Sequence, residues 1–348
     1  MYEYLPWSKK ELIKTINAYR HGQLSILDIE LSGKCNFNCK YCDSPDRHKE
    51  FHVDLERVRV AMMTGRIRWI YICGLGEPTF GRNREVLLRL LEYAEEFGVR
   101  CSIFTNLSNL TEKLIEYVDK GILYLLFKMD SLNSAGVEDL YGIINPQQQV
   151  ANVKSIVDHV HFKDGLTNLA ASIVPTKENM REIPNIVQWC IEHNIYPLIA
   201  ELENAGEGAE VFQQLAPSKE ALSKLKWELF LQNCDEIKVP ICPAMIGGIH
   251  INHDGIITVD RKTGFSCHWF WLENPEVKQI YDFNHAGTWD IYTENIINYR
   301  NSCVPEVRKY INKCSKYTYV FGGCGGSIED ILLGHLALHS SIEEDKGL

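Results

Sequence analysis

Three closely spaced cysteines are the residues whose types and spacing most directly suggest chemistry in this chain. Cys35, Cys39 and Cys42 form a C-x3-C-x2-C run directly after an apolar segment. Thiolates this close in sequence can fold round one iron–sulfur cluster, and three of them leave one iron with an open coordination position. An open iron lets a small molecule bind and react there, whereas a fourth local cysteine would favour electron transfer alone. Zinc sites more usually show paired C-x2-C units, which are missing here; a chance triplet is the other alternative.

One alternating run and, after it, five apolar runs of strand length must position this loop. They span residues 24–31, 69–73, 99–104, 122–127, 169–174 and 196–200, with helical patterns between several of them that stop at Gly98, Gly121 and Asn194. Uniformly apolar strands that alternate with helices predict an α/β protein with a parallel sheet buried on both faces. Such a sheet curls into a full or partial barrel, and its ligand-binding residues lie at the C-terminal strand ends. The cysteine loop follows the first strand, as that rule requires.

Composition narrows the class of protein. The chain has 348 residues, of which 45% are hydrophobic and 24% charged, so it predicts a globular protein with one large domain and an appendage. A net charge of -10 argues against nucleic-acid binding, which needs a basic face. No apolar run approaches the roughly 20 residues that span a bilayer, and no secretion signal precedes the first helix. Twelve cysteines in such a chain indicate reduced thiols, and the predicted location is cytoplasmic.

The cysteine spacing, with Tyr41 just before the third cysteine, resembles the cluster loop of the radical S-adenosylmethionine (radical SAM) superfamily. The resemblance implies a [4Fe–4S] cluster whose open iron is chelated by SAM, with Tyr41 beside the cofactor. It implies reductive cleavage of SAM to methionine and a 5′-deoxyadenosyl radical, and an external electron donor such as flavodoxin or ferredoxin. It also implies a partial (β/α)6 TIM-like barrel, in agreement with the strand pattern.

The segment after the second strand resembles the Gly-Gly-Glu-Pro motif of that family. Gly76, Glu77 and Pro78 match it, while Leu75 departs from the doubled glycine. The resemblance implies that Glu77 holds the SAM amino group. A simple Gly-Pro turn is the alternative.

Later strand ends offer further candidate SAM-binding residues. Asn106 lies in a segment that looks like the family's Thr-Asn-Gly turn, and Lys128 and Asp130 lie where the family has its Ser-x-Asp site. Lys128 replaces the usual serine and could pair with the SAM carboxylate as a cation. Ser172 on the fifth strand is a softer candidate, because a strand serine often bonds to backbone instead.

Four residues are candidates for substrate binding or hydrogen transfer. Glu201 and Glu203 begin an acidic segment after the sixth strand that could bind a cationic or polyhydroxyl substrate, or else form a solvated loop. Cys101 would be a hydrogen donor if its thiol faces the barrel interior. His268 flanks the second group of cysteines, where polar surface is the simpler interpretation.

That second group begins beyond residue 235. Residues 248–259 read as two short strands joined by an Asp-Gly turn, and this segment resembles the SPASM and twitch extensions of radical SAM enzymes. The resemblance implies one auxiliary [4Fe–4S] cluster ligated by Cys242, Cys267, Cys324 and Cys314, with Cys303 as the substitute for Cys314. Ile311 and Val320 stand where the full pattern has two further thiols, so a second auxiliary cluster is not expected. Zinc at the same thiols is the alternative.

The sequence therefore predicts a lead-in (1–23), a radical SAM barrel (24–235), a small α+β auxiliary-cluster domain with a hairpin (236–330) and a C-terminal helix or tail (331–348). The short lead-in and the acidic mouth favour a small polar substrate, such as an aminosugar, aminocyclitol or nucleoside sugar. A ribosomal-peptide maturase is the first alternative. A non-enzymatic iron–sulfur or zinc protein is the second, against which the Glu77 motif argues.

Overall fold

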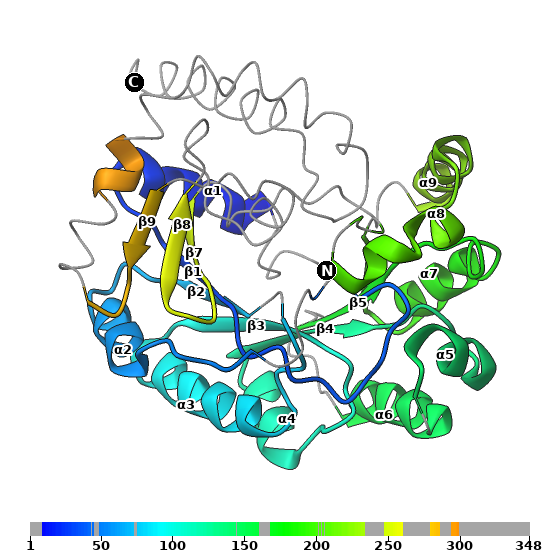
Figure 1. Cartoon of the computed structure of the whole chain (residues 1–348), viewed down its shortest axis with the longest axis horizontal. Helices are drawn as coiled ribbons and strands as arrows, with labels where there is room; N and C mark the ends of the chain where they lie inside the picture. The colour runs from blue at the N-terminus through cyan, green and yellow to red at the C-terminus, as the bar shows by residue number, and fades with distance from the viewer. Residues whose placement is uncertain are drawn as a thin grey trace.

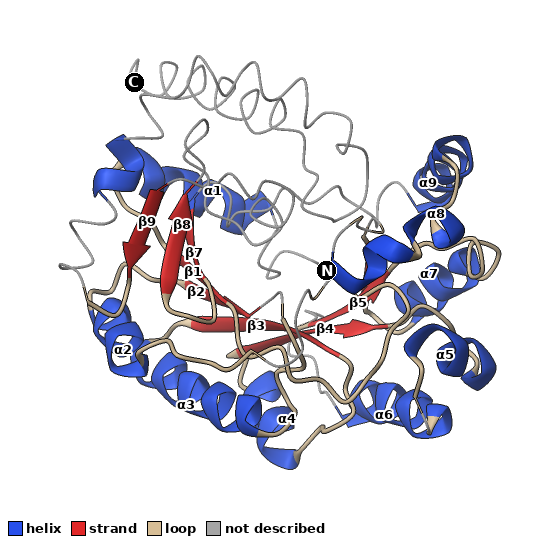
Figure 2. Cartoon of the chain, in the orientation of Figure 1, coloured by secondary structure: helices blue, strands red, loops and turns tan. Residues whose placement is uncertain are grey.

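A curved sheet of nine strands, in the order β6-β5-β4-β3-β2-β1-β7-β8-β9, runs through the described part of the chain (Figure 2). The computed structural model describes residues 9–42, 44, 49–72, 75–143, 145–159, 168–200, 202, 204, 206–233, 247–259, 279–285 and 294–298. The strands are β1 (Ile26–Ile29), β2 (Trp69–Ile72), β3 (Arg100–Thr105), β4 (Leu123–Lys128), β5 (Leu169–Ile173), β6 (Tyr196–Ile199), β7 (Gly248–Ile251), β8 (Ile256–Val259) and β9 (Gln279–Asp282).

Strands β1 to β6 are parallel to their neighbours and alternate with helices, as predicted. The helices are α1 (Lys9–Arg20), α2 (Leu55–Met63), α3 (Arg82–Phe97), α4 (Glu112–Asp119), α5 (Ser134–Tyr141), α6 (Pro146–His159), α7 (Ile183–Glu192), α8 (Phe212–Leu215) and α9 (Lys219–Asn233), with the short 3-10 helix η2 (Gly206–Glu210). Helices α2 to α7 follow the outer side of the curved sheet (Figure 1). The predicted α/β class and partial barrel are therefore confirmed.

The two faces of the sheet carry separate apolar clusters, because successive side chains of a strand point to opposite faces. Leu27 and Ile29 of β1 join the large core that also contains the buried residues of the outer helices. Ile26 packs instead with aromatic residues such as Trp69 on the inner, concave face. By the same alternation Asp28 lies on the inner face with Ile26, and this face is where the barrel's polar residues gather.

Helix α1 lies within the lead-in at residues 1–23. Its buried Glu11 bonds to Arg68, to the indole Nε1 of Trp69 at 3.1 Å and to Arg100 at 3.4 Å. These partners lie where β2 and β3 begin, so α1 is fastened at the amino ends of the strands. Within the described ranges, no helix is long and apolar enough to cross a membrane.

Strand β7 lies beside β1 on the edge opposite β2, in a parallel register that sets His250 against Asp28. Strand β8 returns antiparallel to β7 and confirms the predicted hairpin, while β9 adds a third strand that the sequence patterns did not predict. The first strand of the extension thus continues the barrel sheet. The predicted domain boundaries at residues 235 and 330 fall on residues outside the description and stay predictions.

Candidate active site

The cysteine loop leaves β1 at its carboxyl end, as the sequence predicts. Cys39 is buried, and Cys35 and Cys42 are half-buried. Burial raises the pKa of Cys35 to about 11 and that of Cys39 to about 12. The Cys42 thiol adds to both shifts, and the Cys35 thiol adds to that of Cys39. The three thiols therefore lie within electrostatic reach of one another. No three metal-binding side chains in the described parts of the chain are grouped for a single ion.

Three glycines press against this loop from different elements. A Cβ on Gly76, after β2, would lie 2.1 Å from the Ser32 carbonyl oxygen. A Cβ on Gly142, at the end of α5, would lie 2.8 Å from the Asn38 carbonyl oxygen, and one on Gly208 would lie 2.9 Å from the carbonyl carbon of Tyr41. The backbone N–H of Gly208 also donates to the Cys42 carbonyl at 2.7 Å. The backbones of these three glycines therefore pack directly against the loop from different sides, which a residue with a Cβ could not do.

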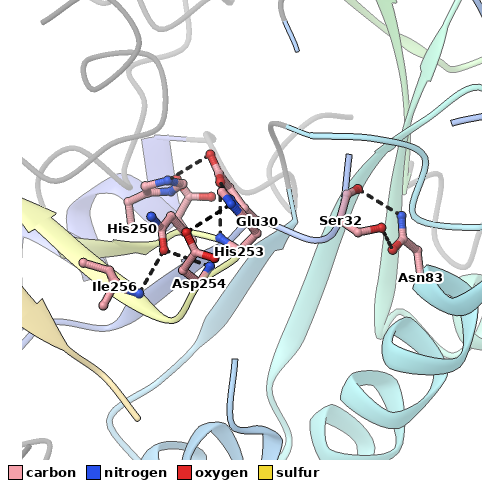
Figure 3. A network of polar contacts seen from close by, with 9 residues as sticks. Glu30, Ser32, Asn83, His250, His253, Asp254 and Ile256 are labelled. Carbon is pink, nitrogen blue, oxygen red and sulfur yellow. Dashed lines mark hydrogen bonds and ion pairs between the residues drawn. The ribbon is translucent and has the colours of Figure 1, made fainter. Parts of the chain in front are cut away.

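Asn83, in the first turn of α3, is a site residue that the sequence patterns missed. Its buried amide nitrogen donates to the carbonyls of Ser32 at 3.2 Å, Lys34 at 3.4 Å and Glu77 at 3.1 Å. Its side-chain oxygen accepts from the Ser32 hydroxyl at 2.5 Å, as Figure 3 shows. One side chain therefore ties the segment before Cys35 to the Glu77 turn. Its helical position carries no local signal for this role.

The Glu77 carboxylate lies at the carboxyl ends of β2 and β3, where it is almost fully buried. It accepts from Thr79 N and Oγ1 at 3.0 and 2.6 Å, from Thr105 Oγ1 at 2.6 Å and from Asn106 N at 2.7 Å. Burial raises the pKa of Glu77, and the bonds from Thr105, Thr79 and Asn106 oppose that shift. The carboxylate thereby joins the turns after β2 and β3, and Pro78 between its partners is buried as well.

Asn106 connects the β3 turn to the cysteine loop. Its side-chain nitrogen lies 3.9 Å from Cys35 Sγ and donates to the Asn36 side-chain oxygen at 3.0 Å. The next residue, Leu107, has φ = 56°, a left-handed conformation that glycine adopts more easily. This backbone conformation is consistent with the predicted Thr-Asn-Gly-like turn.

Lys128, Tyr41 and Asp130 meet where the cysteine loop lies against the C-terminal end of β4. The Lys128 Nζ lies 4.7 Å from the centre of the Tyr41 ring and 5.7 Å from that of Tyr141. The Tyr41 hydroxyl donates to Asp130 Oδ2, whose Oδ1 accepts from the Val174 backbone N–H at 2.5 Å. Asp130 is fully buried, and burial raises its pKa against the opposing effect of the Lys128 charge. Asp130 thus orients Tyr41, and Lys128 places a cation beside the cluster loop.

The remaining predicted site residues have mixed outcomes. Ser172 is buried on β5 in register with Lys128. Cys101 packs in the outer, helix-side core, so the condition for its role as a hydrogen donor, a thiol that faces the barrel interior, is not met. Its strand alternation puts Ser102, not Cys101, on the inner face. The residues Glu201, Glu203, Cys242, Cys267, His268, Cys303, Cys314 and Cys324 lie outside the described residues, and their roles stay predictions.

Comparison with known proteins relates this barrel to a family. Residues 29–190, which contain the cysteine loop and strands β2 to β5, belong to the Radical SAM superfamily. Over 196 residues the chain is 26% identical to a "Probable GTP 3′,8-cyclase" from Sulfurisphaera tokodaii, covering 54% of this chain and 59% of that protein. It is 22% identical to a "Tungsten-containing aldehyde ferredoxin oxidoreductase cofactor-modifying protein" from Pyrococcus furiosus, covering 52% and 54% respectively.

Two solved structures resemble more of the chain. SuiB from Streptococcus suis, bound to the precursor peptide SuiA, aligns with a TM-score of 0.57 and 16% identity, covering 84% of this chain and 70% of SuiB. The protein anSMEcpe, with bound AdoMet and the Cp18Cys peptide, aligns with a TM-score of 0.56 and 12% identity, covering 80% and 82%. At these identities the structural likeness establishes the fold alone. The chain spans less than two thirds of the two curated relatives.

Proposed function

We propose that this chain cleaves SAM reductively at a [4Fe–4S] cluster held by Cys35, Cys39 and Cys42 and directs the resulting radical at a peptide. The proposal of SAM cleavage rests on the geometry of the cysteine loop. Three thiols in mutual electrostatic reach, two of them half-exposed, follow the first barrel strand and face residues from the ends of β3 and β4.

The donor set fits such a cluster, because three soft sulfur ligands suit iron and leave one iron open. When bound, the cluster and SAM supply a 5′-deoxyadenosyl radical that abstracts hydrogen from the substrate. The chain's own residues position that cofactor. We assign Lys128 to the SAM carboxylate, because it is a cation steadied over Tyr41 and Tyr141 beside the loop. We assign Glu77 to the amino group and to the order of the surrounding turns.

A peptide substrate is favoured over the small polar metabolite predicted from the sequence. The structures with bound peptides resemble this chain over 80% or more of its length, beyond the extent of the barrel. The match to the GTP cyclase covers 54%. The inner face also presents Phe104, 39% exposed, at the C-terminal end of β3, which offers apolar contact to a substrate side chain.

The extension is proposed to hold one auxiliary [4Fe–4S] cluster, through Cys242, Cys267, Cys324 and either Cys314 or Cys303. The support is the resemblance of its cysteine pattern to SPASM and twitch extensions. A small iron–sulfur or flavin protein, such as a ferredoxin or flavodoxin, is proposed as the electron donor.

The first experiment tests SAM cleavage. Anaerobically reconstituted protein, given SAM and dithionite, should form 5′-deoxyadenosine, and Cys39→Ala should abolish it. Cys190→Ala is the matched control, because Cys190 is a buried thiol in the outer core on α7. Equal deoxyadenosine from Cys39→Ala and the unchanged protein would refute the assignment.

A second experiment tests the substrate class. A low-mass extract from source cells grown in deuterated medium is added to the reaction, and deuterium in the 5′-deoxyadenosine is measured by mass spectrometry. A peptide substrate should deliver deuterium, and protease treatment of the extract should remove that delivery. Deuterium transfer that survives the protease would replace the peptide with a small metabolite.

A further inference from the structure

The turn between β5 and α7, residues 174–182, reaches across to the end of β4. Asn179 in this turn is buried, and its side-chain nitrogen donates to two backbone carbonyls, that of Asp130 at 3.1 Å and that of Val174 at 3.0 Å. Its side-chain oxygen accepts from the Thr176 backbone N–H at 2.7 Å. The oxygen therefore shapes the turn itself, whereas the nitrogen joins the end of β5 to the end of β4.

Asp130 is held at each of its polar atoms. Its backbone N–H donates to the Tyr141 hydroxyl at 2.9 Å, and its carbonyl accepts from Asn179. Its carboxylate accepts from the Val174 backbone N–H at 2.5 Å and from the Tyr41 hydroxyl. Because Asn179 binds the carbonyls of both Asp130 and Val174, it sets the spacing at which the Asp130 carboxylate meets the Val174 N–H.

The same turn also holds the residues that follow Asp130. The Glu182 carboxylate accepts from the Ser131 hydroxyl at 2.9 Å and from the Leu132 backbone N–H at 2.7 Å. The paired residues of β4 and β5 end with Lys128 opposite Ser172. Past that pair, side chains of the turn thus continue the connection between the two strand ends.

Lys128 is the group whose position depends on this arrangement. Its Nζ lies 4.7 Å from the centre of the Tyr41 ring, and the hydroxyl of that ring donates to Asp130. A shift of Asp130 would therefore move the ring that the cation faces. A charge-assisted hydrogen bond depends steeply on distance and angle, so a small displacement of Lys128 would weaken its contact with a carboxylate.

We propose that Asn179 is a positioning residue for SAM. Through Asp130 it fixes Tyr41, and thereby the Lys128 cation, where that cation binds the SAM carboxylate. The inference rests on the proposed function, in which Lys128 has that role. The competing role is purely structural: Asn179 would shape the turn before α7, and its loss would lower the free energy of unfolding but leave the SAM affinity of the folded protein unchanged.

A double-mutant cycle on SAM affinity separates the two roles. The full chain, reconstituted anaerobically, is compared with Asn179→Ala, Lys128→Met and the double variant, and equilibrium SAM binding is expressed per iron–sulfur cluster. Asn179→Ala should weaken SAM binding about tenfold when Lys128 is present and no more than about twofold in the Lys128→Met background, because its effect passes through the cation. Asn168→Ala, which removes a side-chain bond to the Val118 carbonyl on α4, should leave SAM affinity unchanged.

Thr176→Val is a milder second variant for the case that Asn179→Ala yields little folded protein. The Thr176 hydroxyl bonds to the Asn179 side-chain oxygen at 3.2 Å, so its removal loosens that side chain without deleting it. It should also weaken SAM binding, and again only when Lys128 is present. An unchanged SAM affinity in the folded variant, or an equal loss in both Lys128 backgrounds, would overturn the inference. Failure of the unchanged protein to bind SAM would refute the proposed function, and this inference with it.

Discussion

Gly76 offers a sharp test of how the cysteine loop is held. It has φ = +72°, and a Cβ would lie 2.1 Å from the Ser32 carbonyl oxygen and 2.7 Å from that of Lys34. Both carbonyls are further fixed by the Asn83 amide. Gly98, which caps α3, has φ = +65° but nothing within 4 Å of an added Cβ. The two alanine variants therefore share backbone strain and differ in the clash.

Left-handed backbone costs alanine about 1–2 kcal/mol, and this should be the whole loss of unfolding free energy in Gly98→Ala. Gly76→Ala adds a clash with main-chain atoms that cannot rotate away, which overpacking data put at about 1–3 kcal/mol. Because the displaced atoms precede Cys35, Gly76→Ala should also lower iron content and SAM affinity, whereas Gly98→Ala should change neither. Urea unfolding, iron analysis and equilibrium SAM binding measure these effects. Equal results for the two variants would refute the proposed role of Gly76.

Three further outcomes are expected. Asn83→Ala should lower the free energy of unfolding in urea by about 1–3 kcal/mol, since it leaves buried carbonyls unpaired. It should also reduce iron content. Asn168→Ala, which removes a bond to Val118 far from the loop, should lower the free energy of unfolding and leave iron content unchanged. Lys128→Met should weaken equilibrium SAM binding by about 1.5–3 kcal/mol, while Lys113→Met, which removes a cation over another tyrosine ring, should not. Because burial is outweighed by attraction to Asp28 and its pKa is raised, protonated His250 should contribute fully to the free energy of unfolding below about pH 6.5. That contribution should disappear as the pH rises through about 10. Urea unfolding across this pH range should show no such decrease for His250→Asn.

Much of the barrel could be predicted because its signals are local. The run that became β1 alternates, the runs that became β2 to β6 are mostly apolar, and the glycines after α3 and α4 have the positive φ expected of helix ends. The cysteine loop could be placed at a strand end from order alone. The first-strand residues Asp28 and Glu30 read only as the polar half of an alternating strand, since their histidine partners lie more than 200 residues away.

What the sequence could not supply is pairing between distant segments. Nothing in the pattern of residues 248–251 indicates that they pair with β1. Whether Cys101 faces the barrel interior or the outer helices depends on the direction in which the sheet curves, which the local sequence does not show. Gly208 lay within a segment noted only for its acidic residues. Its contact with Tyr41 and Cys42 is a property of the curved sheet, which brings the loop after the sixth strand against the loop after the first strand.

Glu77 shows how the structure changes the meaning of a motif. The sequence offers a carboxylate at the barrel mouth for an amino group, but its oxygens already accept four hydrogen bonds from Thr79, Thr105 and Asn106. An ionised carboxylate has about four acceptor positions. Three of the four bonds fall on Oε1, from Thr79 N, Thr79 Oγ1 and Thr105 Oγ1, and only the Asn106 backbone N–H reaches Oε2. Oε2 therefore keeps an acceptor position for an arriving ammonium group, while the bonds to Oε1 hold the carboxylate in place.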